Sequence, residues 1–142
     1  MADKSPLDAA QIQEMLDRNP FISFLGCKVE RVDAEAQEIV MTMGMRPEFE
    51  RRPGSGQYHG GVIASFIDTV GDYALVINLG GGVPTINFRT DYLRPAMNGT
   101  RLHGVARVRR AGRTVAVVDI DVMDDDGRLV AVGRGTYGTT VG

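Results

Sequence analysis

The sequence has little cysteine, little histidine and no excess of charge of either sign. Its 142 residues include one cysteine, two histidines and no tryptophan, and 16 basic residues stand against 18 acidic ones. A single cysteine permits no disulfide within the chain, so we expect a cytoplasmic protein. Two histidines and one cysteine offer no metal-binding spacing. A net charge of −2 gives no general attraction to phosphate backbones, which argues against nucleic-acid binding.

Long apolar runs are also missing. No uninterrupted apolar stretch reaches the ~18–20 residues of a membrane span, and residues 1–20 lack the apolar core of a secretory signal peptide. We therefore expect no membrane association and one domain over residues 1–142, because a chain of this length can build a core without metals or disulfides. Glycine, in contrast, is abundant: the chain has 18 glycines, where a usual ~7% would give about ten.

The N-terminal region predicts a short amphipathic helix over residues 5–18. Ser5 is the candidate N-cap and Pro6 the first helical residue, and the helix is expected to end before Asn19-Pro20. Its apolar residues recur at near-helical spacing: Leu7, Ile12, Met15 and Leu16. We expect this segment, within residues 1–19, to pack on the core.

Six later segments show the alternation of apolar and polar residues that is typical of β-strands. They are residues 27–33, 38–44, 85–93, 101–110, 114–123 and 129–139. In the third of these, Ile86, Phe88, Thr90 and Tyr92 share one face, which we expect to be buried. An alternation of this kind predicts an antiparallel sheet covered on one side.

A segment without proline, residues 62–78, predicts a buried helix. Apolar residues surround it on nearly every side, its only interior glycine is Gly71, and Gly80-Gly81-Gly82 ends it. It follows a long loop over residues 45–58. A helix of roughly 17 residues, about 25 Å long, needs a curved sheet around it. The sequence therefore predicts an α+β fold in which an antiparallel sheet wraps one central helix.

Two carboxylates, Asp68 and Asp72, are the only charges on this helix. Burying an unpaired carboxylate is costly, and no lysine or arginine occurs between positions 53 and 88. We expect Asp72 to reach water at the rim of the helix. Asp68, which lies between apolar neighbours nearer the start of the helix, is the candidate for chemistry.

The entrance of the same helix, His59-Gly60-Gly61, leaves backbone N–H groups without helical partners. Such groups, at the positive end of the helix dipole, can stabilise a carbonyl oxygen as it becomes an oxyanion. Asp68 lies eight residues beyond Gly60, about 12 Å along the helix. One chain cannot bring both groups to one carbonyl, so joint action predicts a dimer in which the second copy supplies the partner group.

Other sites are less well supported. Ser55 and Ser65 lack the strand-to-helix context of a nucleophilic serine. Gly80-Gly81-Gly82 follows a helix and so does not fit a nucleotide-binding loop. His59 has two interpretations, a functional residue or a loop histidine that caps the helix.

Several motifs in order carry a family resemblance. They are His59-Gly60-Gly61, the acidic Asp68, the run Tyr92-Leu93-Arg94-Pro95-Ala96, the turn Gly112-Arg113-Thr114, and Gly133-Arg134-Gly135. With these motifs, about residues 20–140 resemble the hotdog-fold acyl-CoA thioesterases, in the subgroup of the phenylacetate-pathway and 4-hydroxybenzoyl-CoA thioesterases.

The resemblance implies hydrolysis of an acyl-CoA or aryl-acyl-CoA thioester to free acid and CoA, with no cofactor beyond the CoA of the substrate. It implies that the Gly60 N–H polarises the thioester carbonyl and that Asp68 of the neighbouring subunit is nucleophile or general base. Thr85 would orient the water, and His59 would support the loop or thioester binding. The implied substrate contacts are Gly61, Gln57, Arg89, Arg94 and Arg113. The implied assembly is a homodimer and a dimer of dimers, a homotetramer.

One position departs from the family pattern. Relatives often carry Asn or Gln seven residues before the first glycine, where this chain has Pro53. Proline has neither a side-chain amide nor a backbone N–H, so Gln57 or Ser55 would have to replace that polar group. The departure leaves a second function open, in which the same scaffold binds an acyl-CoA or an acyl carrier without turnover. A hotdog dehydratase is a weaker alternative, because no His and carboxylate pair is dedicated to β-hydroxyacyl chemistry.

Overall fold

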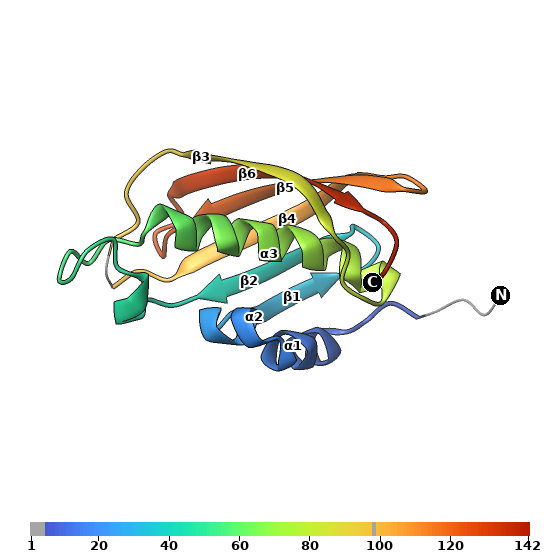
Figure 1. The fold of residues 1–142 in the computed structure, drawn as a ribbon, viewed down its shortest axis with the longest axis horizontal. Helices are drawn as coiled ribbons and strands as arrows, with labels where there is room; N and C mark the ends of the chain where they lie inside the picture. The colour runs from blue at the N-terminus through green and yellow to red at the C-terminus, as the bar shows by residue number, and fades with distance from the viewer. Residues whose placement is uncertain (1–4, 98) are drawn as a thin grey trace.

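The computed structural model describes residues 5–97 and 99–142. A single six-stranded antiparallel sheet, with strand order β1-β2-β4-β5-β6-β3, forms its main layer. The elements in chain order are α1 (Ala9–Arg18), α2 (Pro20–Leu25), β1 (Lys28–Asp33), β2 (Glu38–Met43), the 3₁₀ turn η1 (Pro47–Phe49), α3 (Gly60–Leu79), β3 (Thr85–Tyr92), β4 (Leu102–Ala111), β5 (Val115–Met123) and β6 (Leu129–Gly138). Figure 1 shows α3 lying along the sheet, with the N-terminal helices beside β1.

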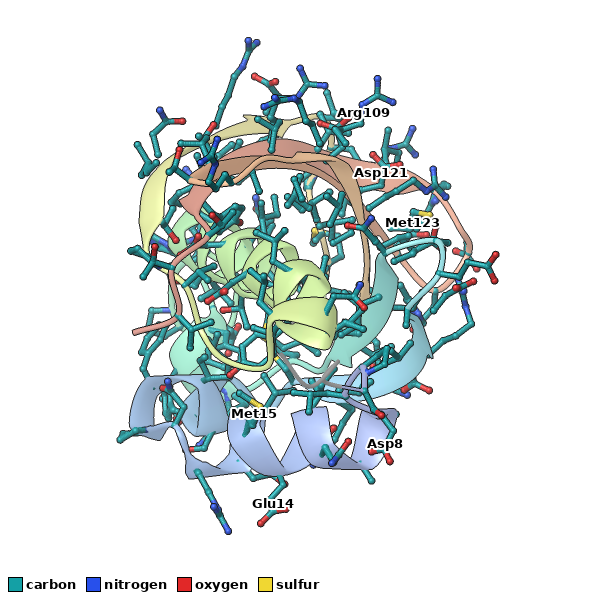
Figure 2. The ribbon with its side chains drawn as sticks, turned by 90° about the vertical axis from the view of Figure 1, so that its right-hand side faces the viewer. Asp8, Glu14, Met15, Arg109, Asp121 and Met123 are labelled. Carbon is teal, nitrogen blue, oxygen red and sulfur yellow. The ribbon has the colours of Figure 1, made fainter. Side chains whose placement is uncertain are left out.

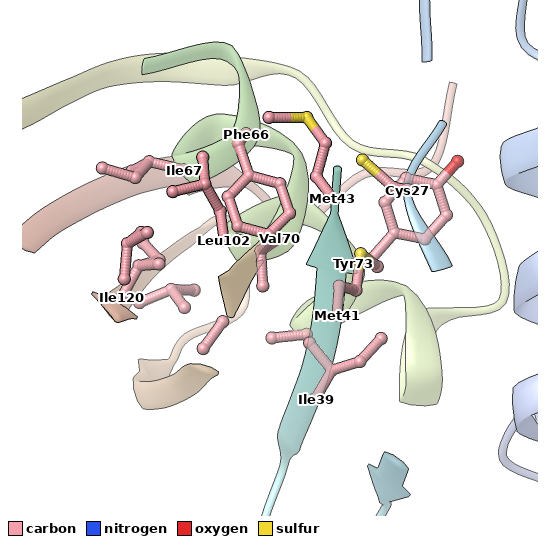
Figure 3. Close-up of a cluster of buried hydrophobic side chains, with 14 of the residues drawn as sticks. Cys27, Ile39, Met41, Met43, Phe66, Ile67, Val70, Tyr73, Leu102 and Ile120 are labelled. Atoms are coloured by element: carbon pink, nitrogen blue, oxygen red, sulfur yellow. The ribbon is translucent and has the colours of Figure 1, made fainter. Parts of the chain in front are cut away.

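The sheet curves around α3, which confirms the predicted α+β arrangement. Seen end-on in Figure 2, the strands form an arch over the helix while α1 and α2 close the open side. The core is the interface between helix and arch, where Phe66 and Val70 of α3 pack near Leu102 of β4 and Ile120 of β5 (Figure 3), all essentially inaccessible to solvent. Burial of this apolar surface is the main stabilising term for the fold.

Close approach between α3 and β6 depends on two glycines. A Cβ at Gly133 would stand 2.5 Å from a methyl group of Ile67, and one at Gly71 would stand 2.2 Å from the hydroxyl of Tyr137. Neither position therefore accepts a side chain without a shift of its neighbours. In the described part of the chain, α3 is the one helix long and apolar enough to cross a membrane. Most of its surface is covered by the sheet, which accounts for that composition.

The N-terminus differs from the prediction at the first helix boundary. Asp8, and not Ser5, is the N-cap of α1, so Pro6 precedes the helix. The Asp8 carboxylate accepts from the Gln11 N–H, and the Gln11 side chain accepts from the Asp8 N–H, at 2.8 and 2.9 Å. A reciprocal pair satisfies two orphan donors, which a lone serine at position 5 does not.

The second helix, α2, was not among the predicted elements. It begins at Pro20, and the side chain of Asn19 caps it by accepting from the Ile22 N–H. Asn19-Pro20 is thus both the end of α1 and a start signal, because proline is favoured at the first position of a helix. α2 brings Phe21 and Ile22 toward the exposed side of α3.

Strand β3 is exposed where we expected burial. It lies at one edge of the sheet, paired with β6 only, and the exposed fractions of Ile86, Phe88 and Tyr92 are 57%, 39% and 53%. The opposite edge differs, because the Gln13 side chain of α1 accepts from the Val29 N–H of β1 and donates to the carbonyl of Cys27, the residue before β1. The predicted inward face of residues 85–93 is therefore uncovered in a single chain. An edge strand with apolar side chains is a surface for pairing with another chain.

Candidate active site

The first turn of α3 leaves one backbone donor free. The Nδ1 atom of His59, the N-cap, accepts from the Gly61 N–H at 2.8 Å, so this histidine does cap the helix. The Gly60 N–H has no acceptor among the described residues. Tyr92 packs against Gly60 and donates its hydroxyl to the Gly60 carbonyl at 2.6 Å. The turn is fixed while the Gly60 N–H stays available at the positive end of the helix.

A cavity of about 440 Å³ opens beside this turn. It brings together three predicted site residues, Gln57, His59 and Gly60, and adds the predicted Arg94 at its wall. Arg51 also lines it, and the lining contains no carboxylate. Pro53 lies outside, in an exposed turn, so Gln57 is the polar side chain that the loop offers at the cavity. The chemistry of this cavity suits an anionic ligand.

Asp68 lies two turns further along α3 and is held by two neighbours. Thr85, at the start of β3, donates its hydroxyl to the Asp68 Oδ1 at 2.8 Å. The buried hydroxyl of Tyr137 donates to the backbone carbonyl of Asp68 at 3.1 Å. The predicted pair Asp68 and Thr85 is thus in direct contact, which leaves the second carboxylate oxygen for another partner.

A second cavity, of about 340 Å³, has Asp68 and Asp72 in its wall. Its other residues are Asn19, Phe21, Ile22, Ala64, Ser65, Thr69 and Phe88, with no lysine or arginine among them. Burial raises the pKa of Asp72 to about 7; the Val83 N–H opposes the shift, and the charge of Asp68 adds to it. Asp72 is therefore half-buried in the wall of this hollow, a position that the sequence alone did not predict.

Gly60 and Asp68 line two different cavities of one chain, as the spacing of eight residues along the helix requires. The first cavity holds donors and cations, and the second holds carboxyls. A ligand bound in the cavity beside Gly60 does not contact Asp68 of the same chain. The site shared by two copies, expected from the sequence, stays a prediction.

The remaining predicted residues lie elsewhere. Gly61 lines a hollow beside α2, with Phe21 and Phe24. Arg89 is on β3 and pairs with Asp91 at 3.1 Å, beside a charged cavity on the outer surface of the sheet. Arg113 is exposed in the β4–β5 turn and lines neither the Gly60 cavity nor the Asp68 cavity. Among the described residues, no group of three or more His, Cys, Asp or Glu is placed to hold a metal ion.

Comparisons with known proteins agree with this geometry. The model of the thioesterase superfamily matches residues 56–131, which include α3 and strands β3, β4 and β5. A proposed esterase of Halobacterium salinarum is 37% identical and covers 91% of this chain and 90% of its own length. Acyl-coenzyme A thioesterase 13 of Homo sapiens is 30% identical, with 88% of this chain and 89% of that protein covered.

Solved structures give the same fold. The Escherichia coli PaaI protein from the phenylacetic acid degradation operon superposes with a TM-score of 0.81 at 27% identity, over 92% of this chain and 91% of that one. The arrangement of a sheet arched over one long helix is therefore the hotdog fold of these thioesterases.

Proposed function

The chain belongs to the thioesterase superfamily, and on that premise we propose that it hydrolyses an acyl-CoA or aryl-acyl-CoA thioester at a site shared by two copies of the chain. Water and the thioester give a free carboxylic acid and CoA. Asp68 of one copy acts on the carbonyl carbon, and the Gly60 N–H of the other copy binds the carbonyl oxygen. The observation that carries the proposal is the carboxylate of Asp68, which is bonded to Thr85 and lines a cavity without a cation.

Asp68 has two chemically sound roles. As a general base it removes a proton from water while the water oxygen bonds to the carbonyl carbon. As a nucleophile its oxygen bonds to that carbon and water later hydrolyses the anhydride. In both cases the C–S bond breaks and the CoA sulfur takes up a proton. The Thr85 hydroxyl, donating to Oδ1, keeps the other oxygen directed to the cavity or places a water beside it.

Gly60 supplies the complementary group. As the carbonyl becomes tetrahedral, its oxygen gains negative charge, and a preorganised N–H at a helix start stabilises that charge. The Gly60 N–H has no acceptor among the described residues, and the contact between His59 and Gly61 holds the turn in place. We assign the phosphates of CoA to the neighbourhood of Arg51 and Arg94, the two cations of this cavity.

The exposed edge of the sheet supports the dimer. Ile86 and Phe88 on β3 expose apolar surface at a strand edge with no partner in the described chain. Pairing of β3 with β3 of a second copy covers these side chains and extends the sheet across a two-fold axis. The same pairing runs the two α3 helices in opposite directions, so that Asp68 of one copy approaches Gly60 of the other. Sedimentation of the native chain measures the mass of the assembly, and it tests both the dimer and the implied dimer of dimers.

Thiol release from a panel of acyl-CoA and aryl-acyl-CoA esters tests the function. Replacing Asp68 by asparagine is expected to lower kcat roughly 100- to 10,000-fold, the usual contribution of a general base. The matched control is Asp121→Asn, the same change at an exposed carboxylate of β5, which should leave turnover unchanged. Equal rates for native chain and Asp68→Asn would contradict the assignment.

A second function, binding without turnover, is favoured by Pro53, which replaces a polar residue that relatives often carry. The same panel separates the two. Tight binding of CoA esters by the native chain, with no thiol released from any ester, would support the binding module and refute hydrolysis.

A further inference from the structure

The donor in the proposed reaction is the backbone of a glycine, the residue with the freest backbone. Gly60 has no Cβ to restrict its rotation, and a second glycine, Gly61, follows it. A hydrogen-bond donor for an oxyanion is most effective when it is held in place before the reaction begins. The contacts that hold Gly60 therefore matter for turnover.

Gly60 lies between two peptide planes, and the plane before it carries the donor N–H. The carbonyl oxygen of that plane belongs to His59 and accepts from the N–H groups of Val62 and Ile63 at 3.0 and 3.3 Å. These bonds come from the helix itself. They fix one side of Gly60 and leave its other side to other contacts.

The plane after Gly60 is held at both of its polar atoms. The Gly61 N–H donates to the Nδ1 atom of His59 at 2.8 Å, and the Gly60 carbonyl accepts from the Tyr92 hydroxyl at 2.6 Å. The Tyr92 ring also packs on the glycine, because a Cβ at Gly60 would stand 3.2 Å from the ring carbon that bears the hydroxyl. Tyr92 thus restrains Gly60 from β3, outside the helix and its N-cap.

The strand that carries Tyr92 also contacts the other half of the proposed site. β3 begins at Thr85, whose hydroxyl donates to the Asp68 Oδ1 at 2.8 Å, and it ends at Tyr92. Hydroxyls at the two ends of one strand therefore contact the two functional positions of α3, Asp68 and Gly60. Because β3 is also the proposed pairing strand, the contact between Tyr92 and Gly60 joins the dimer surface to the donor.

We propose that Tyr92 is a positioning residue for thioester hydrolysis: its hydroxyl fixes the peptide between Gly60 and Gly61 and so keeps the Gly60 N–H directed at the carbonyl oxygen. The proposal rests on the proposed hydrolysis at Gly60 and Asp68. Tyr92 also lines the Gly60 cavity, so direct contact with the substrate is the rival explanation. A tyrosine hydroxyl has one proton to donate, and Tyr92 donates it to the Gly60 carbonyl, which favours positioning.

Tyr92→Phe tests the hydroxyl, because it keeps the ring on Gly60. We expect kcat for thiol release to fall roughly 3- to 10-fold, the effect of losing one neutral hydrogen bond, while KM changes by less than about two-fold. The matched control is Tyr73→Phe, the same change at a buried tyrosine of α3 that lines neither the Gly60 cavity nor the Asp68 cavity. It should leave kcat unchanged. All chains are compared at a concentration where sedimentation gives the mass of the native assembly.

The same change combined with Gly60→Pro separates positioning from direct contact with the substrate. Proline at position 60 has no N–H to position, so Tyr92→Phe should lower kcat no further in that variant. A direct contact or a general packing defect predicts the same fall in kcat with glycine and with proline at position 60. That result, or no fall in the native chain, would overturn the proposal.

A measurement independent of turnover decides if the native chain releases no thiol from any ester, an outcome that refutes the proposed hydrolysis separately. The NMR order parameter of the Gly60 amide reports how firmly its N–H is held. It should be lower in Tyr92→Phe than in the native chain and unchanged in Tyr73→Phe. Equal values in the native chain and in Tyr92→Phe would show that Tyr92 does not position the donor.

Discussion

The first turn of α3 and the middle of the same helix present opposite chemistry. Around Gly60 the cavity wall holds a free N–H and two arginines, with no carboxylate. Around Asp68 it holds two carboxyls together with neutral polar and apolar side chains, with no cation. Thioester hydrolysis needs both sets at one carbonyl, a donor for the oxygen and a carboxylate for the carbon or for water. The difference supports the proposal that one chain carries two halves of a site, which a second chain joins.

The largest expected effect comes from a change in β3, the strand that we propose joins the two halves of the site. Ile86→Lys places a charge on the exposed apolar edge of β3 and should abolish both dimer and turnover, because desolvating an unpaired charge opposes pairing. Sedimentation and thiol release measure the two losses. Val115→Lys makes the same change at an exposed apolar residue of β5 and should preserve both. A monomer that retains full turnover would contradict a site made from the Gly60 region of one chain and the Asp68 region of another.

Removing the Gly60 N–H alone tests the half of the proposed site at the start of α3. Gly60→Pro deletes the backbone N–H at the first helical position, where proline is tolerated and where the extended backbone of His59, with φ −63° and ψ 139°, suits a following proline. We expect kcat to fall roughly 100- to 1,000-fold, the usual effect of losing one oxyanion donor. Gly60→Ala is the control, because it adds a Cβ against the Tyr92 ring but keeps the N–H. Similar kcat values for these two variants would exclude the Gly60 N–H as the donor.

The Asp68 half of the proposed site is tested at the hydroxyl of Thr85. Thr85→Val removes the bond to Asp68 while retaining the shape of the side chain, and Thr85→Ser restores the hydroxyl. A hydrogen bond to a charged group contributes about 1.5–3 kcal/mol, so kcat should fall roughly 10- to 100-fold in the valine variant and recover in the serine variant. The measurement is thiol release at saturating ester. Loss in both variants would indicate a packing defect instead of a missing hydroxyl.

The smallest expected effect is on the pH dependence of the Tm when Asp72 is replaced by asparagine. The pKa of Asp72 rises from an ordinary 3.8 to about 7 in the folded chain, so the folded state binds more proton than the unfolded state between these values. The stabilising contribution of the proton is fully present below about pH 4 and is lost as the pH rises toward 7. Asp72→Asn has no such proton, so its Tm relative to the native chain should increase over this range. A pH-independent difference would show that Asp72 does not titrate as described.

Much of the fold could be predicted because its signals are local. Glycine turns and alternating side chains place β2, β5 and β6 within about two residues of their observed bounds, and the apolar surface of residues 62–78 identifies the central helix. α2 differs from the sequence prediction because Asn19-Pro20, a stop signal for α1, also caps and starts a second helix. The N-cap of α1 differs from the prediction for a related reason, since the reciprocal bonds of Asp8 and Gln11 outweigh a lone serine.

The site could be predicted only where one chain determines it. Gly60 and Asp68 follow from a helix entrance and an isolated carboxylate, both visible in sequence. The exposure of Ile86 and Phe88 could not be predicted, because alternation predicts an apolar face but not which surface covers it. The cavity beside Asp72 depends on α2, an element far from it in sequence. Arginines are the least predictable, since Arg89 pairs with Asp91 on β3 instead of facing the Gly60 cavity.

Mixing two inactive chains tests the shared site most directly. Asp68→Asn retains the Gly60 N–H, and Gly60→Pro retains the Asp68 carboxylate, so a mixed dimer contains one intact site and one doubly damaged site. Equal amounts, unfolded together and refolded, should form mixed dimers in half of the population and recover about a quarter of native thiol release, given two-fold symmetry. Turnover no higher than the mean of the two variants would contradict a site built from two chains.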